Sequence, residues 1–279
     1  MRPSKYFAAI LAAAFGAVAL PAQAQETAAW SYQPSYADLA DLSDAADLVL
    51  RARIKKVAEL EPARAPGLAP GYARLYVEAE TGQLIAGNVP IGEQVRYLVD
   101  VRRDSRGKVP KLKKQEVLLF ARPSSRPGEL QLVGQGAQLP YTPGLEAQVR
   151  PVLAGLMSAQ RPPVVTGVRD ALSVPGNLVG ESETQLFLDT REGSPVSITV
   201  TRRPNMSPVW GVSWSEIVDQ SARAPQPGTI EWYRLACALP ASLPAQAFLG
   251  GDPANRAQAE ADYRLVRSEL GPCQRNRPS

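Results

Sequence analysis

Ser105 and Lys108 have the S-x-x-K spacing that penicillin-binding proteins and serine β-lactamases use for acyl transfer. In those enzymes the serine opens a helix, so that the lysine one turn later reaches and activates the serine hydroxyl. Here Gly107 and Pro110 favour a loop, and the companion motifs S-D-N and K-T-G do not occur. We therefore predict no serine nucleophile.

Carboxylates are the next candidates for chemistry. Asp189-Thr190 begins like the Asp-Thr-Gly of aspartic peptidases, but Arg191 follows it and no second copy exists to share a proton. Glycosidases need only two suitably placed acids. The second half of the chain contains Glu181, Glu183, Glu216, Asp219 and Glu231. A carboxylate-dependent hydrolase is therefore an alternative, with Glu216 or Glu231 as the acid to test.

Several classes of chemistry are excluded by composition. The chain has no histidine, which removes the Ser-His-Asp and Cys-His arrangements and histidine-ligated zinc or haem. GxSxG, Walker A and dinucleotide-binding motifs are also absent. Four acids recur at every third position, but no Gly-containing calcium loop accompanies Asp38, Asp41, Asp44 and Asp47. We predict no catalytic residue, cofactor or metal site.

The strongest local feature is positive charge between residues 96 and 114. This segment contains two acids, Asp100 and Asp104, and eight basic residues, namely Arg96, Arg102, Arg103, Arg106, Lys108, Lys111, Lys113 and Lys114. Such a field can steer an anionic partner. Nucleic acid is disfavoured because Tyr97 is the only aromatic side chain there on which a base could stack. An anionic lipid, a glycan or an acidic envelope protein fits better, and a solvated loop is the alternative interpretation.

The first 24 residues have the pattern of a secretory signal. Arg2 and Lys5 precede an uncharged apolar run from 7 to 20, and Ala22-Gln23-Ala24 forms a small-x-small cleavage site. We predict cleavage between Ala24 and Gln25. No later segment is apolar for long enough to span a bilayer. The expected mature protein is therefore soluble and periplasmic or secreted.

The chain has two cysteines, Cys237 and Cys273. In an oxidising compartment they can pair without leaving a free thiol. A catalytic or metal-binding thiol is the competing interpretation, but it lacks a histidine partner and a CxxC spacing. We predict a disulfide.

The elements of the first half follow an arm over residues 25–34. Apolar spacing and Ser35 as N-cap predict a helix over 36–48. Alternating segments divided by Gly and Pro then predict strands over 48–57, 72–80, 93–101, 117–121 and 129–133. Short strands at this density are typical of a small antiparallel barrel.

Three of these segments carry a resemblance. The runs 46–52, 74–77 and 117–120 resemble the OB-like barrels of exported bacterial proteins and of netrin-like modules. The chain as a whole resembles uncharacterised exported proteins of Gram-negative bacteria with such a barrel. Netrin-like modules usually carry cysteines near the start of the barrel, which this stretch lacks. The resemblance implies a fold and transfers no functional residue.

The second half begins after a connecting helix over 141–160, which Thr142 caps and Pro151 should kink or divide. Strands are predicted over 184–189, 196–201, 210–214 and 230–237. Trp210 and Trp214 would fill the core, or alternatively form a sugar-stacking platform. A helix over 253–270 begins at Pro253 and ends before Gly271.

We therefore expect a mainly β (α+β) protein with four segments. These are a signal peptide (1–24), an arm, helix and OB-like barrel (25–139), a connecting helix (140–163) and an antiparallel β meander closed by a C-terminal helix (164–279). The expected function is non-catalytic binding in the cell envelope through the basic segment. A hydrolase of envelope polysaccharide and a purely structural envelope protein are the alternatives.

Overall fold

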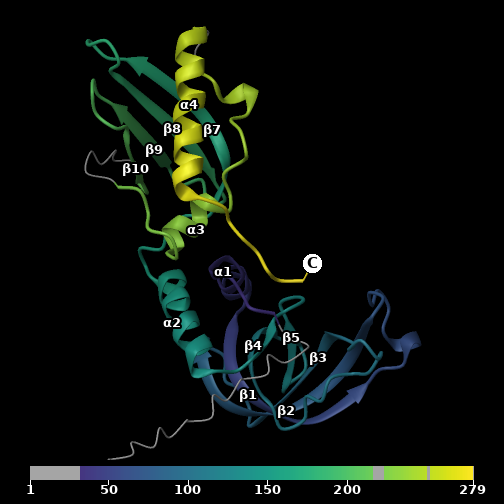
Figure 1. The fold of residues 1–279 in the computed structure, drawn as a ribbon. Coiled ribbons are helices and arrows are strands. Elements are labelled where there is room, and N and C mark those ends of the chain that lie inside the picture. The colour runs from purple at the N-terminus through teal and green to yellow at the C-terminus, as the bar shows by residue number, and fades with distance from the viewer. Residues whose placement is uncertain (1–31, 216–222, 250–251, 279) are drawn as a thin grey trace, which may run out of the picture.

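The structure is a computed structural model that describes residues 32–215, 223–249 and 252–278. The predicted cleavage site at Ala24 and Gln25, and the acids Glu216 and Asp219, lie outside these residues. Figure 1 shows a barrel at one end of the molecule and an open sheet at the other, with helices between them.

The barrel contains β1 (Leu48–Glu59), β2 (Tyr72–Ala86), β3 (Gln94–Arg102), β4 (Glu116–Pro123) and β5 (Glu129–Leu132). Its strands follow the order β1-β2-β3-β5-β4, and pairing between β1 and β4 closes it. Among the described strands of this barrel, only β3 and β5 pair in parallel. The short β6 (Gln138–Pro140) adds to β4. The OB-like barrel expected from the strand pattern is confirmed.

Alternation places one face of each strand inside the barrel. In β2, Ala73, Leu75, Val77 and Ala79 are buried, and the residues between them face outward. β2 extends past the predicted end at Glu80 because three register shifts in β1 let the two strands curve together as far as Ala86. Outward side chains of β2 and β3 are therefore available for a surface site.

Three helices join the barrel to the sheet. α1 (Tyr36–Ala45) starts with a capping box formed by Ser35 and Asp38. α2 (Pro143–Met157) is capped by Thr142 and runs past Pro151 without being divided. Burial of the α2 residues on both sides of the proline holds this helix together, namely Val149, Val152, Leu153 and Leu156.

The prediction of a strand over 230–237 is wrong. This segment is α3 (Ile230–Ala236), with Thr229 as its N-cap. Every residue from Trp232 to Ala236 is buried, so the segment shows neither the alternation of a half-buried strand nor the stripe of a surface helix. Periodicity alone cannot distinguish the two structures in such a run.

The open sheet is an antiparallel meander in the order β10-β9-β8-β7. It contains β7 (Val165–Pro175), β8 (Ser182–Thr190), β9 (Val196–Arg202) and β10 (Val209–Ser213). β6 and β7 were not predicted. β7 contains register shifts near Gly167 and Asp170, which interrupt its period of two. α4 (Pro253–Leu270) covers one face of the sheet (Figure 1).

One hydrophobic core fills the barrel, and a second runs from the outer side of β4 through the three helices to the open sheet. The predicted disulfide between Cys237 and Cys273 is present. It joins the end of α3, not a strand, to the tail over 271–278 that follows α4. Among the described residues, no helix has the length and hydropathy that crossing a bilayer requires.

Candidate functional site

The predicted basic segment does not form one cluster. Arg96 lies near the start of β3 and is exposed. The other seven residues begin six positions later, at Arg102, and continue through the β3–β4 loop over 103–115. At about 3.3 Å per residue, six positions of strand separate Arg96 from Arg102 by about 20 Å. Arg96 therefore belongs to a different surface from the loop.

The β3–β4 loop is held by its own contacts. The carboxylate of Asp104 accepts hydrogen bonds from the backbone N–H groups of Arg106 and Lys108. Arg103 pairs with Glu59 at the end of β1. Leu112 is buried beneath the loop. Ser105 and Lys108 thus lie in a turn and not on a helix, as the sequence predicted.

Five cations of this loop are exposed and have no ion pair among the described residues: Arg106, Lys108, Lys111, Lys113 and Lys114. Asp104, the one acid between residues 103 and 115, accepts from backbone N–H groups and pairs with none of these cations. The loop can attract anions, but none of these five cations lines the groove described below.

A groove of about 1070 Å³ lies on the outer face of β2, β3 and β5. Its ends are formed by the β1–β2 loop (60–71) and the β4–β5 turn (124–128). In OB-folds, the face of the second and third strands together with these two connections binds oligosaccharides and oligonucleotides. The groove thus occupies the position at which this type of barrel binds ligands.

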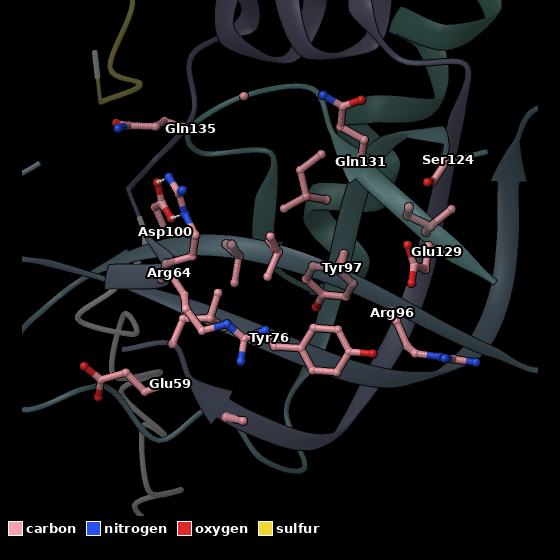
Figure 2. A pocket seen from close by; sticks show the side chains of 18 of the residues that line it. Glu59, Arg64, Tyr76, Arg96, Tyr97, Asp100, Ser124, Glu129, Gln131 and Gln135 are labelled. Carbon is pink, nitrogen blue, oxygen red and sulfur yellow. Dashed lines mark hydrogen bonds and ion pairs between the residues drawn. The ribbon is translucent and has the colours of Figure 1, made fainter. Parts of the chain in front are cut away.

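Tyr76 is the central aromatic residue of the groove. Figure 2 shows its ring between the side chains of Arg64 and Arg96. Leu98 lies directly across from Tyr76 on β3 and keeps 46% of its surface exposed. Neither Arg64 nor Arg96 forms an ion pair among the residues that the structure describes. The groove therefore presents an apolar surface with a free guanidinium on each side.

The floor of the groove is fixed by an ion pair between Arg74 and Asp100, which lie opposite each other on β2 and β3. Arg74 donates two hydrogen bonds of 2.7 Å to the Asp100 carboxylate, and these bonds raise the pKa of Arg74 above its ordinary value. Arg74 also donates to the carbonyl of Pro66 and so positions the β1–β2 loop that carries Arg64. The two charges neutralise each other, so the pair has a structural role in the groove and offers no free charge to a ligand.

Most other charges around the groove are paired, but Glu61, which also lines it, has no ion pair among the described residues. Glu59 is engaged by Arg103, and Glu129 lies 3.8 Å from Arg126. Polar side chains without charge complete the lining, namely Ser124, Gln131 and Gln135. An aromatic ring, an exposed leucine, amides and two free guanidinium groups can bind a sugar chain that carries acidic groups.

The described acids of the hydrolase alternative do not come together. Glu181 and Glu183 lie at the β7–β8 hairpin, and Glu231 lies in the first turn of α3. Figure 1 places α3 at the other end of the sheet from that hairpin. No group of three or more metal-ligating side chains occurs in the described ranges.

The acids of α1 prove to be structural. Asp38 is fully buried and accepts hydrogen bonds from the backbone of Asn276 and Arg277. Burial would raise the pKa of Asp41, but hydrogen bonds from Arg275 and Tyr233 hold it below its ordinary value. These contacts tie α3 and the C-terminal tail to α1. Nothing in the sequence indicates them, since the partners are about 190–240 positions apart.

Trp210 is buried, and its indole N–H donates to Glu269 on α4 at 2.6 Å. Trp214 is partly buried against the same core. Both tryptophans therefore fill the core of the second half, and the alternative of an exposed sugar-stacking platform is not supported.

Sequence reasoning identified Arg96 but missed Arg64, Tyr76 and Leu98. Tyr76 and Leu98 occupy outward positions of predicted strands, which is the signal that could have found them. Their juxtaposition depends on the register of β2 against β3. No protein-family model matches this chain, and no curated protein is significantly similar to it.

Proposed function

We propose that this protein is a non-catalytic binding protein of the cell envelope that takes an anionic glycan in the groove over β2, β3 and β5. The observation that carries the proposal is Tyr76 between two unpaired arginines, Arg64 and Arg96, in a groove of OB type. The ring and Leu98 would cover the apolar face of a sugar, and the guanidinium groups would bind its carboxylates or phosphates.

The basic loop assists binding from a distance. Its exposed cations do not line the groove, so they would attract the glycan and raise its local concentration without determining which sugar is bound. This role is sensitive to salt, because charges at exposed sites are screened over about 8–10 Å at physiological ionic strength.

The N-terminal sequence and the disulfide support a location outside the cytoplasm. Residues 1–24 have the three regions of a secretory signal. The Cys237–Cys273 bond fits an oxidising compartment, in which disulfides form and persist. The protein would therefore act in the periplasm or after secretion.

The binding test compares oligogalacturonate, which carries a carboxylate on every sugar, with an uncharged glucan of the same length. Titration calorimetry on the mature protein should detect the acidic sugar only. Arg64→Gln and Arg96→Gln should each weaken binding about tenfold or more, because each removes a charge-assisted contact. Tyr76→Ala should weaken it by a similar factor.

Arg264→Gln provides the matched control, since Arg264 is 70% exposed on α4, far from the groove. It should bind as the unchanged protein does. Equal affinity of the Arg64, Arg96 and Tyr76 variants and the unchanged protein would refute the groove as the binding site.

A further inference from the structure

The end of the open sheet that lies farthest from the barrel exposes apolar side chains (Figure 1). Ten large apolar side chains are exposed among the described residues, and half of them belong to this end of the sheet. These five residues form what we call the apolar tip, namely Val174, Leu178, Val179, Met206 and Val209. Val179 is 98% exposed, and Met206 is 62% exposed.

The register of the sheet brings these residues together. Leu178 and Val179 lie in the β7–β8 turn (176–181), and Met206 lies in the β9–β10 turn (203–208). β8 and β9 remain paired as far as the residues next to the two turns, so both turns leave the sheet side by side. Directly below them runs one cross-strand row, made of Val174, Glu183, Thr201 and Val209. Contiguous exposed apolar surfaces of this kind mark interaction sites.

The β7–β8 turn holds its apolar side chains outward. Glu181 closes this turn, because its N–H donates to the carbonyl of Leu178 and its carboxylate accepts from the N–H of Leu178 at 3.2 Å. The carbonyl of Glu181 also accepts from the N–H of Gly176. A Cβ on Gly176 would collide with the Glu181 side chain, so glycine lets the carboxylate reach the turn. Polar groups of the turn are thus engaged within it, while Leu178 and Val179 project into solvent.

The charges beside the apolar tip suit a layer of lipid headgroups. Arg203 opens the β9–β10 turn, is exposed, and forms no ion pair within the described part of the chain. Its guanidinium would bind a lipid phosphate while Met206, three positions later, enters the apolar layer. Glu181 is engaged by the β7–β8 turn, and Glu183 lies in the row below both turns. Glu183 therefore limits the depth of insertion to the turns, because burying its charge in lipid is costly.

We propose that the apolar tip docks this protein on a phospholipid bilayer, with Leu178, Val179 and Met206 inserted at the interface. A second protein molecule is the less suitable occupant, because a stable protein interface takes about 20–30 residues from each partner. The apolar tip offers two turns of six residues each, which project from the sheet beside an unpaired guanidinium. Narrow projecting turns of this kind fit a fluid lipid surface, which closes around them without needing a complementary shape.

Docking by the apolar tip would hold the barrel away from the bilayer. β8 runs for nine residues from the β7–β8 turn toward α3, and at about 3.3 Å per residue it spans about 30 Å. The barrel lies beyond the opposite end of the sheet (Figure 1). The inference is independent of glycan binding, since the apolar tip and the groove have no residue in common.

Co-sedimentation of the mature protein with phosphatidylcholine vesicles tests the proposal. These vesicles carry no net charge, and in about 1 M salt charges are screened beyond about 3 Å, so the basic loop contributes little. The unchanged protein should sediment with the vesicles. Leu178→Ser combined with Val179→Ser should lower the partition coefficient about tenfold or more, because binding at the interface follows the buried apolar area. The matched control, Leu84→Ser combined with Met157→Ser, removes two exposed apolar side chains elsewhere and should bind as the unchanged protein does.

A fluorescent label measures insertion directly. Val179→Cys, labelled with an environment-sensitive fluorophore, should shift its emission to the blue when vesicles are added and should be quenched by lipids with brominated acyl chains. The same label on Met157→Cys, which is exposed at the end of α2, should do neither. Urea unfolding should show nearly equal stability for all of these variants, because they change exposed positions.

Three results would overturn the proposal. The first is that the unchanged protein does not sediment with the vesicles, and the second is that the tip variant and its matched control bind equally. The third is a doubled mass in solution that Leu178→Ser combined with Val179→Ser abolishes, which would assign the apolar tip to a second copy of this chain.

Discussion

Asp44 of α1 and Arg234 of α3 form a bidentate ion pair, with N–O distances of 3.0 and 3.1 Å, across 190 positions of the chain. The Arg234 side chain is 5% exposed, and its Nε has no hydrogen-bond partner among the described residues. The pair lies between the helix that opens the barrel half and the helix that follows the open sheet (Figure 1). It therefore contributes to holding the two halves together.

Asp44→Ala should lower the free energy of unfolding by about 2–4 kcal/mol, because it leaves a buried guanidinium without its anion. The expected loss lies below that of a fully buried pair, since the Asp44 side chain is 29% exposed. Urea unfolding measures the effect. Asp47→Ala, in the same region and exposed, is the control and should change stability by less than about 0.5 kcal/mol. Equal losses in both variants would contradict a specific role for the pair.

Stability should fall in acid partly through Asp41. Its pKa is held below the ordinary value in the folded protein, so the folded state favours the ionised carboxylate. The stabilisation is present above the unfolded pKa, about 3.9, and is lost as pH falls through the lower folded value. Asp41→Asn should therefore be less stable than the unchanged protein at pH 7, and the difference should shrink below about pH 4. A difference that stays constant from pH 7 to pH 2, in urea unfolding, would rule out this titration.

Removal of the disulfide should destabilise the second half. The bond closes a loop of 36 positions, and the chain-entropy model assigns such a loop about 3–4 kcal/mol. The double variant Cys237→Ser with Cys273→Ser should show this loss in urea unfolding under non-reducing conditions. Added reductant should then affect only the unchanged protein. If the variant and the unchanged protein unfold at the same urea concentration, the bond does not restrain the unfolded chain.

Neutralising the basic loop should slow glycan association and flatten its salt dependence. The variant changes Arg102, Arg106, Lys108 and Lys111 to Gln, and it keeps Arg103, which pairs with Glu59. Stopped-flow association with oligogalacturonate at several salt concentrations measures the effect. Unfolding should be unaffected, because exposed charges contribute little to stability.

The control for the loop variant removes the same number of positive charges from exposed sites in the second half, namely Arg161, Arg191, Arg203 and Arg264. This control distinguishes the effect of where the charges lie from the effect of the protein's net charge. Equal slowing in both variants would assign the effect to net charge and not to the loop.

Elements with local signals were predicted well. Asp252, Pro253 and Gly271 delimit α4, and the observed helix runs from Pro253 to Leu270. Ser35 and Thr142 cap α1 and α2 as expected. Caps act within one turn of the residues that form them, so adjacent sequence is sufficient to locate them.

The candidate site was predicted only in part. Arg96 was included for its charge, and the extended strand β3 places it about 20 Å from Arg102 and the loop cations. Arg64 and Tyr76 were missed, because no local pattern shows that the β1–β2 loop lies against the outer face of β2, where both residues line the groove. The sequence shows how many charged residues there are, but only the folded structure shows on which surface each of them lies.

By itself the sequence determined a mainly β protein with capped helices, an OB-like series of strands and a single disulfide pairing. Strand alternation and helix capping depend on residues only a few positions apart, and two cysteines allow only one intramolecular pairing. Tertiary structure alone decided the helical state of α3, the short parallel contact of β3 with β5, and the pairing of Asp38 with the backbone of Arg277. Burial on all sides and contacts between distant residues determined these features, and neither leaves a local pattern in the chain.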